Sequence, residues 1–418
     1  MSSTERPATV SSLLGSISDV GRDAARGGYS RPVYSTAELD LRSWFRDEAQ
    51  RRGLEVRTDR NGVLWAWWGP EAQDSLVTGS HLDSVPGGGA FDGPLGVAAA
   101  LAAVDVLKAR GVTAGQGRRS LAVTVFPEEE GSRFGIACLG SRLLTGAIDA
   151  DKARNLKDAE GNSYAELSAR NGVDPRGLGA DPEALSRIGQ FVELHVEQGR
   201  GLIDADPISG GAAGTGFPVA VGGAILGHGR WKFSISGQGN HAGTTLMADR
   251  ADPLVAAAQI ILAVQKTAAA RDGARATVGR ILPIPGGTNV IASKVELWLD
   301  VRHPDDAVTA AIVQKIHGQA QIAAANEGCT VSLAEESLSP TVGFDMGLQR
   351  RLQALLPGAP VLDTGAGHDA GILASVVPSG MLFIRNPTGI SHSPQEQVEE
   401  ADADYAATAL ADVLEGLL

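Results

Sequence analysis

Cysteine is nearly absent from this sequence, and so are segments that would direct or anchor a chain at a membrane. Cys138 and Cys329 are the only cysteines in 418 residues, too few for a disulfide framework at this length. No apolar run approaches the ~20 residues that span a bilayer. Met1–Asp19 also lacks the basic start and apolar core of a signal peptide. We therefore expect a protein of a reducing compartment, the cytoplasm, without membrane association.

Positive charge is also scarce. Lysine and arginine number 36 against 49 acidic residues, so the formal net charge is -13 at pH 7. An acidic chain disfavours nucleic acid and anionic membrane surfaces, because both carry the same sign. Hydrophobic residues make up 43 % and charged residues 20 %, which is ordinary for a globular protein. A chain of this length exceeds the size of one core, so we expect two domains.

Short apolar segments alternate with helical segments through the first part of the chain. Ser35 and Glu38 form a capping pattern before a helix, which a strand pair follows. Strands separated by helices predict a doubly wound, mainly parallel α/β sheet. The expected strands are Leu54–Thr58, Val63–Trp68, Ser75–Gly79 and Leu121–Phe126, and the expected helices are Gly93–Arg110 and Ala137–Thr145.

A glycine-rich stretch, Ser209–Gly216, interrupts this alternation, and the pattern beyond it is different. The order strand, helix, strand, strand, helix, strand predicts a ferredoxin-like α+β unit inserted into the first domain. We expect residues 1–209 and 338–418 to form one domain and residues 210–337 the inserted one. The inserted elements are Arg230–Ser236, Pro253–Ala270, Ala276–Leu282, Lys294–Val301, Ala307–Asn326 and Thr330–Ala334, and Met381–Ile384 is a strand of the first domain.

Acidic or imidazole side chains follow four of the apolar segments. His81, Asp83 and Asp92 follow the first, and the run Glu128–Glu130 follows the second. Open α/β sheets place their sites at the carboxyl ends of strands. Asp83 could orient a metal-bound imidazole, and one carboxylate of the run could bind metal while its neighbour acts as general base. Taken alone, His81 is more simply a surface loop histidine, Asp92 a helix cap and the acidic run a solvated turn.

His195 and His392 follow two further apolar segments, Phe191–Val192 and Met381–Ile384. Each alone is compatible with a structural histidine. Four strand ends that each deliver an acid or an imidazole nevertheless indicate a two-metal hydrolase site. Mixed histidine and carboxylate ligands suit zinc, with manganese, nickel or cobalt as substitutes.

The inserted unit has polar residues of its own. Arg302 could bind a substrate carboxylate with two hydrogen bonds, Asn289 could add a neutral one, and His241 could donate to an oxyanion. A strand-edge ion pair, a turn asparagine and a capping histidine explain the same residues about as well.

The motifs together resemble one group of proteins. They are GSHLDSVPGGGAFDGPLGV, EEEGSRFG, HVEQG, GNHAGTT, TNVI with DVR, GAGHDA and GISHSP, in that order. From about Leu39 onward the chain resembles the amidase/hydantoinase/carbamoylase group of the M20 metallopeptidase-like superfamily. This group includes N-carbamoyl-L-amino acid hydrolases, beta-ureidopropionases and allantoate amidohydrolases. No G-x-S-x-G motif is present, which disfavours a serine hydrolase.

The resemblance implies roles for the metal-binding residues. His81, Asp92 and His195 would bind one divalent ion, zinc or manganese, and Asp92 would bridge to a second. Glu130 and His392 would complete the second. It further implies that Glu129 is the general base and that Asp83 orients His81.

The resemblance also implies that Gln198, Asn289 and Arg302 bind substrate and that His241 of the partner subunit stabilises the oxyanion. A homodimer would therefore form through the inserted domain, which would act as a lid. Its closure would bring Arg302 and Asn289 together onto the substrate carboxylate.

Two features depart from the group. Leu246 stands where a proline is frequent, which would affect the loop of His241, and Ser209–Gly223 is unusually rich in glycine. His368, in GAGHDA, is expected to shape the pocket without binding metal. The favoured reaction is hydrolysis of an N-carbamoyl-L-amino acid. The alternatives are an allantoate or beta-ureido hydrolase, an aminoacylase or dipeptidase, and a metal-binding protein without activity.

Overall fold

The computed structural model describes residues 8–204 and 217–418. The chain divides into two compact units, Met1–Ala224 with Gly343–Leu418, and Ile225–Val342. The expected boundary at residue 209, like the stretch Ser209–Gly216, lies outside the described residues. At the other boundary the last strand of the second unit continues to Ser339, because its pairing with a neighbouring strand extends to Ser339 opposite His228.

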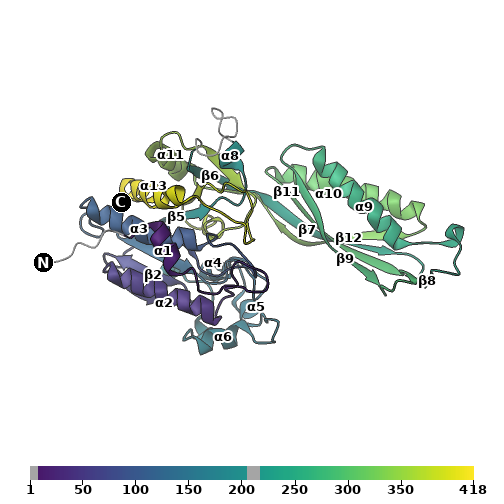
Figure 1. The fold of residues 1–418 in the computed structure, drawn as a ribbon, viewed down its shortest axis with the longest axis horizontal. Coiled ribbons are helices and arrows are strands. Elements are labelled where there is room, and N and C mark those ends of the chain that lie inside the picture. The colour runs from purple at the N-terminus through teal and green to yellow at the C-terminus, as the bar shows by residue number, and fades with distance from the viewer. Residues whose placement is uncertain (1–7, 205–216) are drawn as a thin grey trace. The chain divides into compact units, whose positions relative to one another are not determined.

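The first unit is built on a large mixed sheet whose centre is parallel (Figure 1). Neighbouring strands β4, β3, β5 and β15 all run in one direction, whereas β1, β2 and β6 join antiparallel on the flanks. This confirms the expected α/β class. The strands are β1 Glu55–Thr58, β2 Leu64–Trp68, β3 Ser75–His81, β4 Leu121–Phe126, β5 Ile188–Val196, β6 Val219–Ile225, β13 Val342–Gly343, β14 Val361–Thr364 and β15 Ser379–Ile384.

Helices cover both faces of this sheet. On one face, α1, α3 and α13 pack against each other over a core of alanine, leucine and valine, with α2 beside α3. On the other face, α4 and α12 contact one another, and α12 packs on β5 and β15. The bounds are α1 Val10–Ser16, α2 Thr36–Arg51, α3 Pro94–Ala109, α4 Leu139–Thr145, α5 Ala150–Arg154, α6 Tyr164–Arg170, α7 Pro182–Arg187, α8 Gly201–Asp204, α11 Met346–Leu355, α12 Asp369–Leu373 and α13 Glu400–Leu417.

The start of α2 follows from its first residues. The Ser35 hydroxyl accepts a hydrogen bond from the Glu38 amide at 3.2 Å, which satisfies an orphan donor of the first turn. The Glu38 carboxylate accepts the Tyr34 amide at 2.9 Å and pairs with Arg42. Only the serine half of the expected capping box is therefore formed, because the carboxylate is held by other donors.

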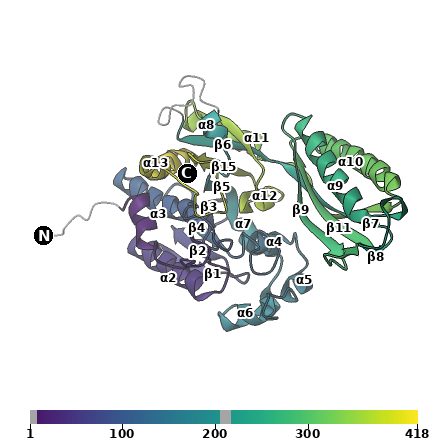
Figure 2. The ribbon, with the colours of Figure 1, turned by 45° about the vertical axis from the view of Figure 1, so that its right-hand side comes forward.

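The second unit is an antiparallel four-stranded sheet in the order β12-β7-β11-β9. Side chains alternate along β7 and β11, so that one face of the sheet is buried. Figure 2 shows α9 and α10 side by side on that face, where the apolar core of the unit lies. The bounds are β7 Gly227–Ser236, β8 Asn240–His241, α9 Pro253–Ala269, β9 Arg275–Ile284, β10 Val290–Ile291, β11 Lys294–His303, α10 Asp306–Asn326 and β12 Thr330–Ser339.

The order of the main elements, β7-α9-β9-β11-α10-β12, is that of a ferredoxin-like unit. Both cysteines are free and buried, Cys138 in the first unit and Cys329 in the second. Among the described residues, no helix combines the length and the apolar character needed to cross a bilayer.

Candidate metal centre

The parallel strands deliver acidic and imidazole side chains to one edge of the first sheet. His81 is the last residue of β3 and pairs in register with Phe126, the last of β4. His195 precedes the last residue of β5, and its partner Phe383 precedes the last of β15. The acidic run Glu128–Glu130 directly follows β4, and His392 lies in the loop after β15. The carboxyl ends of four neighbouring strands therefore meet where open α/β sheets place their sites.

A first trio of ligand atoms comes from His81, Asp92 and His195, all buried. The Nε2 atoms of the two histidines lie 3.5 Å apart. Asp92 Oδ1 lies 3.4 Å from His81 Nε2 and 3.2 Å from His195 Nε2. All three atoms thus face a common point.

A second trio comes from Asp92, Glu130 and His392. The other oxygen of Asp92, Oδ2, lies 3.4 Å from His392 Nε2, which is 3.2 Å from Glu130 Oε2. One carboxylate therefore presents one oxygen to each trio. In contrast to the first trio, His392 is half exposed, with 50 % of its side chain accessible.

The donor set fits divalent ions. Two ligands at 2.0–2.2 Å from one tetrahedral ion lie about 3.3 Å apart, close to the separations within each trio. Burial raises the pKa of Glu130 well above its usual range, and the charge of Asp92 adds to this. Carboxylates that repel one another in a buried place are stabilised by a cation. Mixed imidazole and carboxylate donors suit zinc, manganese, cobalt or nickel.

Backbone carbonyls orient both histidines of the first trio. The Nδ1 atom of His81 donates to the carbonyl of Asp83 at 3.0 Å, and that of His195 donates to the carbonyl of Val196 at 2.9 Å. A carbonyl only accepts, so the proton is on Nδ1 and the Nε2 lone pair is free for a metal.

The carboxylate of Asp83 was expected to orient His81, but it does not form a hydrogen bond with that ring. It lies 3.7 Å from His81 Nδ1, beyond hydrogen-bond distance. Its two oxygens instead accept the backbone amides of Glu129 and Glu130, at 3.2 and 3.1 Å. Asp83 therefore orients His81 through its carbonyl and fixes the acidic turn through its carboxylate, because two backbone donors point at it.

Glu129 lies beside the first trio. Its Oε2 is 3.7 Å from His81 Nε2, and its Oε1 accepts from the thiol of Cys138 at 3.5 Å. Burial raises the pKa of Glu129 well above its usual range, since His81 only partly offsets burial and Asp369 adds negative charge. A carboxylate next to the ligand atoms is suited to general acid–base chemistry.

Two buried acidic residues near the trios, Glu193 and Asp369, were not assigned to the site from the sequence. Glu193 accepts from the Ser80 hydroxyl and from the Ala370 amide, both at 2.9 Å, and so connects β3, β5 and α12. The ring of His368 lies 4.5 Å from that of His195, and Asp369 accepts from Ser141. Glu193 and His195 are two residues apart on one strand, so period-two alternation already places them on the same face.

His368 belongs with Glu193 and His195 to a third group of candidate ligand atoms. Among the residues that the structure describes, neither ring nitrogen of His368 has a hydrogen-bond partner. Burial lowers the pKa of His368 well below the usual value, and the charge of His195 adds to this. The neutral ring packs behind His195. Its expected role in shaping the pocket stays a prediction.

Gln198 lies at the second trio. Its Nε2 donates to Asp92 Oδ2 at 2.6 Å and lies 3.4 Å from His392 Nε2. The residue predicted to bind substrate is thus adjacent to the ligand atoms of Asp92 and His392.

In the second unit, His241 and Asn289 belong to neighbouring segments. The short strands β8 and β10 pair with Val290 opposite His241, and the Ala242 amide donates to the Asn289 carbonyl at 3.0 Å. Both residues are exposed. Asn289 lies in the segment that connects Ile284, the end of β9, to its strand partner Lys294, the first residue of β11.

Arg302 is at the opposite end of β11. Eight residues of strand separate it from Lys294, which is roughly 27 Å at the usual rise. Within one chain, Asn289 follows the end of β9 that pairs with Lys294, whereas Arg302 pairs with the start of β9. The expectation that Arg302 and Asn289 both bind the substrate carboxylate stays a prediction. Arg302 contacts Asp300 through Nε at 2.8 Å and Nη2 at 3.2 Å.

Leu246, in the loop of His241, has a backbone conformation that proline would also adopt. Its φ is −63°, the value that a proline ring imposes, and its side chain is exposed. The departure from the motif therefore does not by itself require a different loop.

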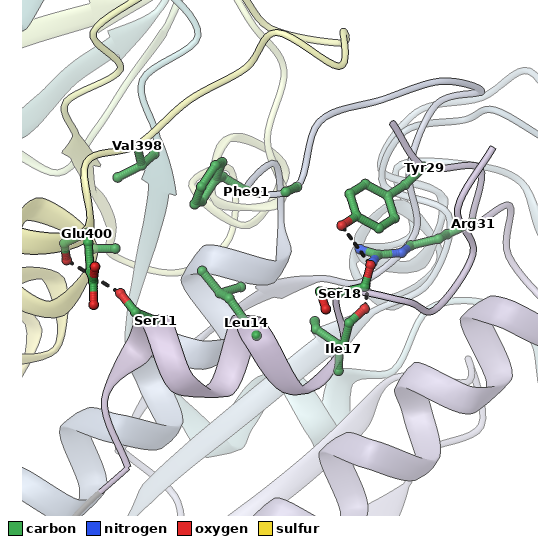
Figure 3. Close-up of a pocket in the computed structure, with 12 residues that line it drawn as sticks. Ser11, Leu14, Ile17, Ser18, Tyr29, Arg31, Phe91, Val398 and Glu400 are labelled. Atoms are coloured by element: carbon green, nitrogen blue, oxygen red, sulfur yellow. Dashed lines mark hydrogen bonds between the residues drawn. The ribbon is translucent and has the colours of Figure 1, made fainter. Parts of the chain in front are cut away.

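A cavity of about 440 Å³ lies near the centre but does not include it. Figure 3 shows Phe91 and Leu14 at its middle, Glu400 at one side, and Arg31 extending under Tyr29 at the other. Arg31 is buried, donates to the carbonyls of Ile17 and Val20, and stacks 4.0 Å from the Tyr29 ring. None of the candidate metal ligands lines this cavity, so we assign the chemistry to the two trios.

Comparisons with known proteins identify the family of the chain. Residues 77–416 match the family model described as peptidase family M20/M25/M40. The chain is 34% identical over 401 residues to the N-carbamoyl-L-amino acid amidohydrolase of Geobacillus stearothermophilus, covering 94% of each. It is 33% identical over 405 residues to the allantoate amidohydrolase of Escherichia coli (strain K12), covering 95% of each.

A solved structure extends the likeness to the fold. The amidase of the hydantoinase/carbamoylase family from Burkholderia multivorans has a TM-score of 0.83 at 28% identity, over 97% of this chain and 96% of that one. The chain therefore belongs to the M20/M25/M40 peptidase family, within its amidase/hydantoinase/carbamoylase group.

Proposed function

We propose that this protein is a two-metal amidohydrolase that cleaves the carbamoyl C–N bond of an N-carbamoyl-L-amino acid and gives the amino acid, carbon dioxide and ammonia. The observation that carries the proposal is the sharing of Asp92 by two ligand trios, with Glu129 beside the first. The full-length likeness to an N-carbamoyl-L-amino acid amidohydrolase supports the ureido substrate.

Five residues would hold the two ions. His81, Asp92 and His195 would hold one ion, and Asp92, Glu130 and His392 the other. When bound, the ions supply positive charge that lowers the pKa of a neighbouring water and polarises the substrate carbonyl.

Glu129 acts as the proton carrier of the reaction. Its carboxylate accepts a proton from water as the oxygen attacks the carbamoyl carbon, and then returns it to the amino nitrogen as the C–N bond breaks. The amino acid and carbamic acid are formed, and carbamic acid decays to carbon dioxide and ammonia. Asp83 keeps Glu129 in place through the backbone hydrogen bond at 3.2 Å.

Binding of the substrate carboxylate requires a positively charged side chain. Arg302 presents Nε and Nη2 side by side, as its contact with both oxygens of Asp300 demonstrates. The same fork suits a substrate carboxylate. Gln198, beside Asp92 and His392, is placed to hydrogen-bond the ureido group.

A homodimer would complete the site. The segments of His241 and Asn289 lie beyond the end of the sheet at which β11 begins with Lys294, and Lys294 is roughly 27 Å along the strand from Arg302. This separation favours contributions to one substrate from two chains. We propose that the partner subunit's His241 donates to the oxyanion and that the partner subunit's Asn289 adds a hydrogen bond to the substrate. The contact would form through the second unit.

The second candidate is hydrolysis of allantoate or N-carbamoyl-β-alanine. The chain is 33% identical to an allantoate amidohydrolase and 34% identical to an N-carbamoyl-L-amino acid amidohydrolase. This small difference is the reason to consider allantoate as the second candidate substrate. The chemistry at Glu129 would be the same, and only the contacts to the rest of the substrate would differ.

Ammonia release from a substrate panel tests the proposal. The enzyme, loaded with Mn²⁺ or Zn²⁺, is given N-carbamoyl-L-amino acids, their D-enantiomers, N-carbamoyl-β-alanine and allantoate, with an N-acetyl amino acid and a dipeptide assayed for amino acid release. We expect the highest kcat/KM with an N-carbamoyl-L-amino acid and loss of turnover on chelation. A preference for allantoate or N-carbamoyl-β-alanine would replace the substrate assignment. Bound metal without turnover of any compound would contradict the enzymatic proposal.

A further inference from the structure

Glu396 is a buried carboxylate outside the two ligand trios, 5 % exposed, in the loop between His392 and α13. Its Oε1 accepts the backbone amides of Phe91 and Asp92 at 2.9 and 3.0 Å. These amides belong to the loop before α3, more than 300 residues away along the chain. One carboxylate thus holds the backbone of Asp92 from the loop of His392.

Ser391 makes a second link between the same loops. Its hydroxyl lies 3.2 Å from Asp92 Oδ2 and 3.3 Å from Glu396 Oε2. Glu396 therefore fixes the main chain of Asp92 through one oxygen, and through the other it fixes the serine that contacts the Asp92 side chain. We call Glu396 and Ser391 the loop clasp.

The clasp acts on the side of Asp92 that faces the second trio. Asp92 Oδ1 faces His81 and His195, which strands β3 and β5 hold independently. Asp92 Oδ2 faces His392 and Glu130, which both lie in loops. His392 also has a φ of 55°, a left-handed conformation that costs free energy unless its surroundings hold it.

Close packing of Gly89 against Glu396 indicates that the Glu396 side chain has a fixed position. A Cβ atom on Gly89 would lie 2.2 Å from Glu396 Oε1 and 2.6 Å from its Cβ. The loop before α3 therefore fits against the Glu396 side chain only because residue 89 is glycine.

We propose that Glu396, with Ser391, is a positioning residue for the second cation: it keeps Asp92 Oδ2 and His392 at the separation at which both bind one ion. The inference rests on the proposed metal centre. It predicts that loss of the clasp weakens the cation of Asp92, Glu130 and His392 and spares the cation of the first trio.

Titration with Mn²⁺ alone, without substrate, tests this. Full-length apoenzyme is titrated by calorimetry, and electron paramagnetic resonance follows the spin-coupled Mn²⁺ pair. The Glu396→Leu variant removes the acceptor at similar volume, and Glu396→Gln keeps an oxygen for the two amides. Gln397→Ala, at the exposed neighbouring position, is the matched control.

For Glu396→Leu we expect the weaker Mn²⁺ step to lose about 10- to 100-fold in affinity, a usual cost of removing a group that orients metal ligands. The pair signal should disappear at Mn²⁺ concentrations that saturate the wild type, and the tighter step should stay unchanged. Glu396→Gln should restore both, and Gln397→Ala should behave as wild type. If Glu396→Leu does not fold, Ser391→Ala should still weaken only the second step.

The proposal is overturned if the wild type binds a single Mn²⁺, if both steps weaken together, or if Glu396→Gln is as impaired as Glu396→Leu. It is also overturned if Ser391→Ala binds Mn²⁺ as the wild type does. Since no substrate is present, these results are independent of the substrate panel. A failure of the ureido assignment would leave two-step Mn²⁺ binding and its selective weakening in Glu396→Leu intact, whereas a failure of the clasp proposal would remove that selectivity.

Discussion

His81 and His195 are buried at the ends of β3 and β5, and backbone carbonyls fix their rings at 2.9–3.0 Å. His241 and Asn289, in the second unit, lie exposed in segments outside its main sheet. The first set is arranged by the fold before any ligand arrives. In the second set, His241 Nδ1 accepts the Gly243 amide of its own loop at 3.1 Å. Under the proposed function, this set acts only in the site of a partner subunit.

Replacement of Glu129, the proposed general base, should have the largest effect. For Glu129→Gln we expect kcat to fall by about 10³-fold, within the range lost with a general base, while metal content is unchanged. Ammonia release and metal analysis of the same sample measure both. Glu128→Gln is the matched control, because Oε1 of that residue alone accepts the amides of Arg133 and Phe134. Retention of most turnover by Glu129→Gln would exclude it as the base.

Mixed dimers should show whether His241 acts in the site of the partner subunit. His241→Ala alone should lose about 10²-fold in kcat, as expected for one oxyanion donor. After random mixing with Glu129→Gln, half of the dimers contain both variants and each has one intact site, so we expect about a quarter of wild-type turnover to return. Each variant refolded alone through the same procedure is the control. Absence of recovery would place His241 in the site of its own chain.

Arg302→Lys should have the smallest effect of the three. A lysine gives one point of contact in place of two, so we expect KM to rise about tenfold, or ~1.4 kcal/mol, with kcat nearly unchanged. Arg280→Lys, which alters an arginine stacked 4.3 Å from Trp298 in the same unit, is the control. An equal rise in KM for both variants would argue against a specific role of Arg302.

The metal centre was largely predictable because strand ends converge. Once four apolar segments are recognised as parallel strands, the side chains that follow them must meet at one edge. His81, His195 and the acidic run required no more than this. The ferredoxin-like unit was predictable for a similar reason, since alternation along β7 and β11 is regular.

Other features depend on distances that a sequence pattern does not contain. The carboxylate of Asp83 is two residues from His81, yet it accepts amides 46 residues away. Glu396 acts on a backbone amide at Asp92, and any residue type there would offer the same amide. The segment from Ala150 to Arg187 folds as short helices without a long periodic pattern, and it received no prediction.

The close contact of α3 with β5 restricts which positions can be varied to obtain new substrate specificities. A Cβ on Gly96 would lie 2.1 Å from the carbonyl oxygen of Leu194, the residue before His195. A Cβ on Gly93, the residue after Asp92, would lie 2.5 Å from the His81 ring. Substitution of Gly93 or Gly96 should therefore displace the strand end or the ring that carries a candidate ligand. Libraries that seek other ureido compounds should vary the exposed neighbours of His241, such as Leu246 and Met247, where the chain tolerates change.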